Sequence, residues 1–156
     1  MDTNTLQWFI AASLPKGICG ASMTACDDDL YLLGDYSTNV YSCSLQALLQ
    51  SCQTPEKASA SQQISVWNRI TDLPVSSSTA ITLCGQLVCV GGEKDEKAVD
   101  SVYCYNPATA AWEIIGSIPS SQSFPLVTTL PPGDKVIVVY GRRRHTTVAV
   151  ANAVMS

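Results

Sequence analysis

The stretch Gln86-Leu87-Val88-Cys89-Val90-Gly91-Gly92 decides how the rest of the sequence is interpreted. It is an apolar run that ends in a double glycine. A charged segment follows, and then comes a second run, Ser101-Val102-Tyr103-Cys104-Tyr105; after a turn, Trp112 opens a third run. Short apolar runs separated by turn-forming residues are typical of strands covered on both faces. We therefore expect short antiparallel β-strands, with no long helix.

The same landmarks recur on both sides of this stretch, which indicates an internal repeat. Each tryptophan is followed seven residues later by a proline, in the pairs Trp8 and Pro15, Trp67 and Pro74, and Trp112 and Pro119. Apolar runs also end at glycine in the corresponding places, at Gly34, Gly91 and Gly141. The repeat predicts units of four short strands each, in which the tryptophan belongs to the fourth strand.

We expect the whole chain, 1–156, to be a single repeat region. The units are predicted at 21–73, 79–118 and 124–151, with an additional tryptophan-bearing strand at 8–14. The last unit shows no fourth strand, so the chain carries its strands in cyclic order, with the cut between a third and a fourth strand. Residues 46–65 form an insertion whose polar composition predicts a surface loop, preceded by one or two helical turns at 44–52.

The amino-acid composition and the net charge exclude or disfavour several classes of protein. Hydrophobic residues make up 46% of the chain and charged residues 14%, which excludes a disordered chain. The net charge of −4 disfavours a nucleic-acid partner, and no apolar run is long enough for a transmembrane helix. Seven cysteines without a C-x-x-C pair predict buried thiols and no metal site. Such thiols favour an intracellular, cytoplasmic location, because the cytoplasm keeps cysteine reduced.

The middle unit resembles the kelch repeat, in which a strand ends in Gly-Gly and a later tyrosine is followed seven residues on by tryptophan. Val90-Gly91-Gly92, Tyr105 and Trp112 have this pattern, and the resemblance extends over about residues 8–151. The first unit departs from it at Gly34-Asp35 and at Cys43, which replaces the tyrosine. The residues expected to have only this structural role are Gly91, Gly92, Tyr105, Trp112, Trp67, Trp8, Gly34 and Gly141.

The resemblance implies an all-β fold of kelch-type β-propeller blades, about three of them, each with four antiparallel strands. Three blades in a row leave two large apolar faces open. Three explanations stay open. The chain is a piece of a longer propeller, or it is half of a six-bladed ring, in which the Trp8 strand of one copy completes the third blade of another. In the third explanation it is half of a mixed assembly.

A catalytic site is not expected. His145 is the only histidine, and it follows three arginines on a predicted loop. The resemblance instead implies a non-catalytic module or scaffold for protein–protein interaction, without cofactor or metal and without a membrane or nucleic-acid partner. The candidate partner-binding residues are Glu93, Lys94, Asp95, Glu96, Arg142, Arg143 and Arg144. Two alternatives remain: a fragment of a propeller oxidase or hydrolase whose active-site residues lie outside this chain, and the substrate-receptor part of a ubiquitin ligase.

Overall fold

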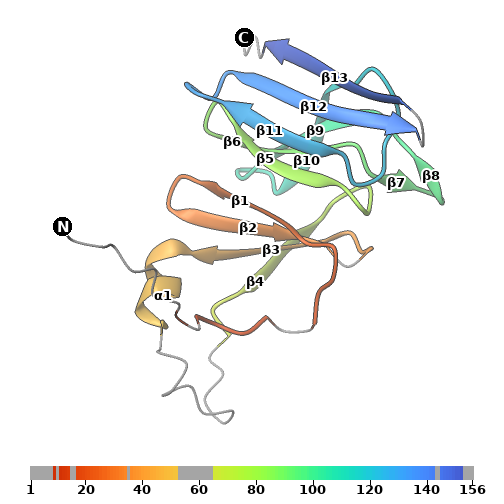
Figure 1. Ribbon diagram of the computed structural model, residues 1–156. Coiled ribbons are helices and arrows are strands. Elements are labelled where there is room, and N and C mark those ends of the chain that lie inside the picture. Colours follow the sequence, from red (N-terminus) through yellow and green to blue (C-terminus); the bar gives the residue numbers. More distant parts are fainter. Residues whose placement is uncertain are drawn as a thin grey trace.

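Three antiparallel sheets lie side by side in the computed structural model, which describes residues 9, 11–14, 17–34, 36–52, 65–142 and 145–152 (Figure 1). The first sheet has the order β1 (Ser22–Cys26), β2 (Asp29–Leu33), β3 (Asn39–Ser44) and β4 (Asn68–Asp72). The middle sheet has the order β5 (Thr79–Leu83), β6 (Gln86–Val90), β9 (Ser101–Asn106) and β10 (Ala111–Ser117). The third sheet has the order β11 (Leu126–Leu130), β12 (Lys135–Arg142) and β13 (His145–Asn152).

The predicted all-β fold is confirmed, and each sheet draws its strands from one of the expected units. Trp67 directly precedes β4, and Trp112 lies within β10. One short helix, α1 (Leu45–Gln50), follows β3 where helical turns were predicted; residues 53–64 of the expected insertion lie outside the described residues. A two-stranded hairpin of β7 (Glu93–Lys94) and β8 (Lys97–Ala98) was not predicted, because its charged sequence looks like a plain loop.

The middle sheet lies between the other two (Figure 1). It contributes a different set of side chains to the core on each side. Leu87 and Cys89 of β6 belong to the core shared with the first sheet. Val88 and Val90 of the same strand belong to the core shared with the third sheet. Successive side chains of a strand point to opposite faces. A strand buried on both faces must therefore be apolar at every position, which explains the uninterrupted run of the sequence.

Polar side chains join the sheets along the first strand of each. The Ser22 hydroxyl accepts a hydrogen bond of 2.9 Å from the Ala80 amide, and the hydroxyls of Thr24 and Thr82 lie 3.0 Å apart. On the other side, the Thr79 hydroxyl donates to the Pro125 carbonyl at 2.6 Å. The strands β1, β5 and β11 are thus the neighbouring inner strands of three successive sheets, as in a ring of blades.

The aromatic signature residues fill the core between the first and middle sheets. Tyr105 and Trp112 are paired across β9 and β10, with ring centroids 5.0 Å apart. Both pack in the cluster that includes Leu33 and Val40 of the first sheet. Trp8, the equivalent residue at the start of the chain, lies outside the described residues.

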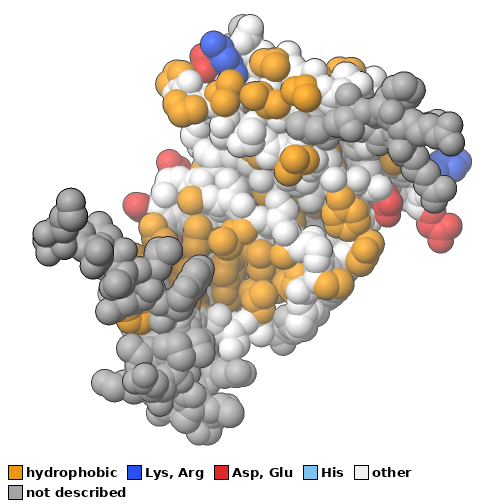
Figure 2. All heavy atoms as spheres, viewed as in Figure 1, with side chains coloured by type: hydrophobic (Ala, Val, Ile, Leu, Met, Phe, Trp, Pro, Cys, Tyr) orange, Lys and Arg blue, Asp and Glu red, His pale blue; other side chains and the backbone are white. Residues whose placement is uncertain are grey.

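The two expected open faces differ. On the outer face of the third sheet, Leu126, Val148 and Val150 are 70%, 58% and 61% exposed, and Figure 2 shows apolar atoms over this sheet. On the outer side of the first sheet, however, Leu32 and Tyr41 are buried. The expectation of a large open face is therefore met at the third sheet and is wrong for much of the first. No helix in the described part of the chain has the length and apolar character needed to cross a membrane.

Candidate interaction surface

Loops from all three sheets gather at one end of the molecule. In the first sheet, Ser22 pairs with Leu33 and Asn39 with Asp72. The start of β1, the turn between β2 and β3 and the end of β4 therefore lie at the same end of this sheet. The middle sheet repeats this arrangement, since Thr79 pairs with Val90. We call this end the loop face and define it by residues 17–20, 36–38, 75–78, 93–100 and 120–124. Loops on a rigid scaffold are the usual place for recognition residues.

Backbone hydrogen bonds lock three of these loops together. Ser76 and Glu93 exchange two bonds, of 2.9 and 2.8 Å. Gln122 accepts a bond of 2.7 Å from the Gly92 amide and donates one of 3.0 Å to the Val99 carbonyl. The Phe124 amide donates to the Ser77 carbonyl at 2.7 Å. These bonds satisfy main-chain groups that would otherwise be unpaired away from regular strands, so the loops hold one arrangement.

The double glycine makes this locking possible. A Cβ atom on Gly91 would stand 2.7 Å from the Gln122 carbonyl oxygen, which is closer than real side chains come. A Cβ atom on Gly92 would collide with the Ser76 carbonyl oxygen, and the φ angle of Gly92, 117°, is one that other residues rarely adopt. The two glycines therefore allow the neighbouring loops to approach the end of β6.

Of the charged residues predicted to bind a partner, Glu93, Lys94, Asp95 and Glu96 lie on the loop face. Glu93 is half-buried, and its carboxylate accepts a hydrogen bond of 3.4 Å from the Ser77 hydroxyl. Lys94, Asp95 and Glu96 are exposed at the β7–β8 turn. Arg142 ends β12 opposite His145, far along the chain from this hairpin. Arg143 and Arg144 lie outside the described residues.

An aromatic pair on the loop face was not singled out from the sequence. The rings of Tyr36 and Phe124 meet edge to face, with centroids 5.2 Å apart, although they come from the first sheet and from the entry to the third. Tyr36 is 65% exposed and Phe124 is 40% exposed. Both residues have positive φ angles, 51° and 49°. Bulky residues seldom adopt such angles, and strained backbone of this kind clusters at functional sites.

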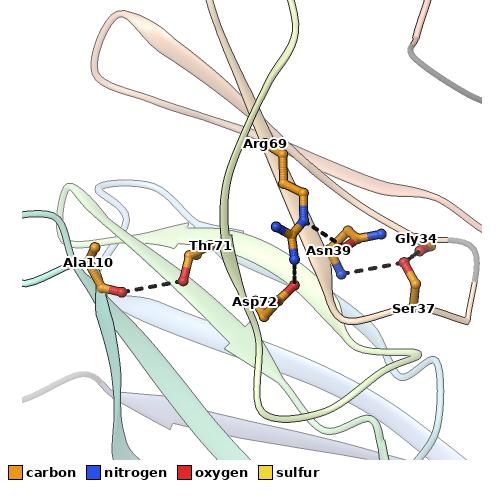
Figure 3. Close-up of polar contacts among 7 residues, drawn as sticks. All are labelled: Gly34, Ser37, Asn39, Arg69, Thr71, Asp72 and Ala110. Carbon is orange, nitrogen blue, oxygen red and sulfur yellow. Dashed lines mark hydrogen bonds and ion pairs between the residues drawn. The ribbon is translucent and has the colours of Figure 1, made fainter.

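A polar network supports the loop that carries Tyr36 (Figure 3). Arg69 of β4 donates to the Asn39 side chain at 2.8 Å and pairs with Asp72 at 2.5 Å. The Ser37 hydroxyl donates to the Gly34 carbonyl at 3.0 Å, and the Leu73 amide donates to the Thr38 carbonyl at 2.8 Å. The ion pair is exposed and contributes at most about 1 kcal/mol, so the network orients the loop more than it stabilises the fold.

Within the described residues, no three His, Cys, Asp or Glu side chains are grouped so that they could hold a metal ion. The thiols of Cys26, Cys43 and Cys89 are buried and form no disulfide. Burial also raises the pKa of the Cys89 thiol far above its ordinary value of 9.0, so this sulfur stays protonated and unreactive.

Comparison with known proteins identifies the repeat of the middle sheet. Residues 74–119 match the model of the kelch motif, and this segment includes the double glycine, Tyr105 and Trp112. The chain carries a kelch repeat. No curated protein matches the chain. The structure is similar to the solved structure of YjhT, with a TM-score of 0.59 and 20% sequence identity over 85% of this chain. At that identity the likeness shows the fold alone, and the sheets of this chain are kelch-type propeller blades.

The chain spans 36% of the length of the YjhT chain that it matches. Its three sheets therefore correspond to about a third of that protein's chain. In the described part of the chain, the loop face and the open side of the third blade are surfaces that other molecules can reach.

Proposed function

We propose that this kelch chain is a non-catalytic module for protein–protein interaction that binds its partner through the loop face. The observation that carries the proposal is the exposed, edge-to-face pair of Tyr36 and Phe124 on loops held in place by main-chain hydrogen bonds. Aromatic side chains dominate the energetics of protein interfaces, and a rigid support lowers the entropy lost on binding. The exposed charges of Lys94, Asp95 and Glu96 form a polar rim beside the pair.

A cytoplasmic location is part of the same proposal. It is supported by the buried thiols of Cys26, Cys43 and Cys89, because unpaired cysteines persist in a reducing compartment. The proposed partner is a protein, since the net charge of −4 gives no attraction for nucleic acid.

The test compares partner capture by the purified full chain and by matched variants. Tyr36→Asn and Phe124→Asn remove one ring each, and asparagine tolerates the positive φ angle that both positions require. Thr109→Asn, in the exposed turn between β9 and β10, is the control. We expect the control to capture the same proteins as the wild type with the same affinity. Each loop variant should bind these proteins at least tenfold more weakly, because it loses an interface hot spot. Equal affinity for all four chains would refute the loop face as the binding surface.

A further inference from the structure

The packing of the third blade against the middle blade leaves a cavity of about 800 Å³. Its wall is mostly apolar and includes Ile81 and Val88 of the middle blade and Val136 and Val138 of the third. Ala149 and Ala151 of β13 form another part of the wall. Its rim includes the exposed Ile115 and Val150, so the cavity opens to the surface, whereas side chains fill the equivalent place between the first and middle blades.

Comparison of the two inter-blade cores identifies what is missing. In the middle blade, Tyr103 stands opposite Cys89 and faces the preceding blade. In the third blade, Ala149 stands opposite Val138 in the same relation, and Ala151 follows two residues later as Tyr105 follows Tyr103. The middle blade also has Trp112, which stacks on Tyr105 from the fourth strand. Two alanines thus replace two tyrosines, and within the described residues the third sheet ends at β13 without a tryptophan-bearing strand.

The outer edge of β13 is also open. This strand pairs with β12 on one side, and no described strand pairs with it on the other. Such an edge has unpaired amides and carbonyls and readily accepts another strand. The third blade therefore lacks both a strand at its edge and a large side chain in its core.

The start of the chain has the sequence of such a strand. Trp8 precedes the first residue of β1, Ser22, by 14 residues, and Trp112 precedes the first residue of β11, Leu126, by the same 14 residues. Residues 8–14 are thus in the sequence position of a fourth strand that leads into the next blade. Among them, Phe9 and Ala11–Leu14 are described, and none belongs to a strand.

The first and third blades lie on opposite sides of the middle blade (Figure 1). We propose that residues 8–14 of a second copy pair with β13 and insert Trp8 into the cavity beside Ala151, and that two copies exchange this strand reciprocally. Since the connection from Trp8 to β1 equals the one from Trp112 to β11, the exchange places the first blade of one copy over the exposed Leu126 and Val150 of the other. The result is a dimer of six blades in which each third blade gains a fourth strand from the other copy.

The experiment is sedimentation of the full chain over a range of concentrations. We expect a particle of twice the chain mass. Trp8→Ser and Ala151→Glu should each give monomers, because the first removes the inserted side chain and the second puts a charge into its apolar seat. Thr109→Glu, in an exposed turn, should stay dimeric. Circular dichroism and cooperative unfolding verify that each variant is folded.

Mixing the two defective chains tests the reciprocal exchange. In a heterodimer both substitutions meet at one junction, and the other junction joins an intact Trp8 to an intact Ala151. We therefore expect the mixture to recover dimers that neither variant forms alone. A monomeric wild type, a dimer that survives both substitutions, or a mixture that remains monomeric would each overturn the proposal.

Discussion

Gly92 shows how a single residue connects the repeat signature to the loop face. It ends the buried β6 run, and its amide and carbonyl bond to Gln122 and Val99. Any side chain there would collide with the Ser76 carbonyl. The signature glycine is therefore required by the approach of other loops, which the local sequence around it does not contain.

Replacing this glycine should destabilise the fold. We expect Gly92→Ala to lower the free energy of unfolding by about 3 kcal/mol, from the unfavourable φ angle and from displacement of Ser76. Gly116→Ala is the matched control, because no atom lies within 4 Å of its added Cβ and its φ is not positive. It should change stability by less than about 1 kcal/mol. Urea titration measures both, and equal effects would contradict the steric explanation.

The buried thiol of Cys89 makes the free energy of unfolding depend on pH in the alkaline range. Burial raises the pKa of its thiol in the folded chain above the ordinary value of 9.0. Below pH 9 the thiol is protonated in both the folded and the unfolded chain, so its titration does not reduce the free energy of unfolding. Above pH 9 only the unfolded chain loses the proton, so the free energy of unfolding falls by about 1.4 kcal/mol per pH unit. Between pH 8 and 10.5 we expect the wild type to lose about 2 kcal/mol more than Cys89→Ala; parallel losses would contradict this.

At the level of elements, the strands of the blades were predictable, and the β7–β8 hairpin was not. An uninterrupted apolar run such as 86–90 predicts a strand that is buried on both faces. The hairpin instead depends on the two backbone bonds between Ser76 and Glu93 and on the turn at Asp95 and Glu96, whose φ angles are 50° and 61°. Two positive φ angles define a tight hairpin turn that usually uses asparagine or aspartate followed by glycine.

This turn offers a stabilising substitution. Glu96→Gly should raise the free energy of unfolding of the hairpin region by up to about 1 kcal/mol, because glycine adopts the required φ angle without strain. Glu96→Ala keeps the strain and should give no such gain. Amide hydrogen exchange of Lys94 and Lys97 measures the effect. Faster exchange in the glycine variant than in the alanine variant would show that the turn is not strained.

At the scale of the whole molecule, the two inter-blade cores are unequal. The first is filled by Tyr103, Tyr105 and Trp112, and the second contains the cavity beside Ala149 and Ala151. Each blade depends on its neighbours for burial. The third blade, with one open face and one loose interface, is therefore the part whose stability should respond most to association.

Association through the third blade makes stability depend on concentration. For a dimer that unfolds to separate chains, each tenfold dilution should lower the apparent free energy of unfolding by about 1.4 kcal/mol. The Trp8→Ser chain should unfold independently of concentration. Thermal melts at several dilutions measure both. A wild-type midpoint that does not move on dilution would mean that the chain unfolds as a monomer.

The sequence by itself determined the all-β fold, the repeat and the structural role of its glycines and aromatics. These follow from apolar runs and from landmarks that recur at fixed spacing, which report burial and turns locally. Only the tertiary structure decided that the rings of Tyr36 and Phe124 meet edge to face, and that Glu93 is half-buried against Ser77. It also showed which inter-blade core contains a cavity. These features depend on contacts between segments far apart in the chain, which no local pattern contains.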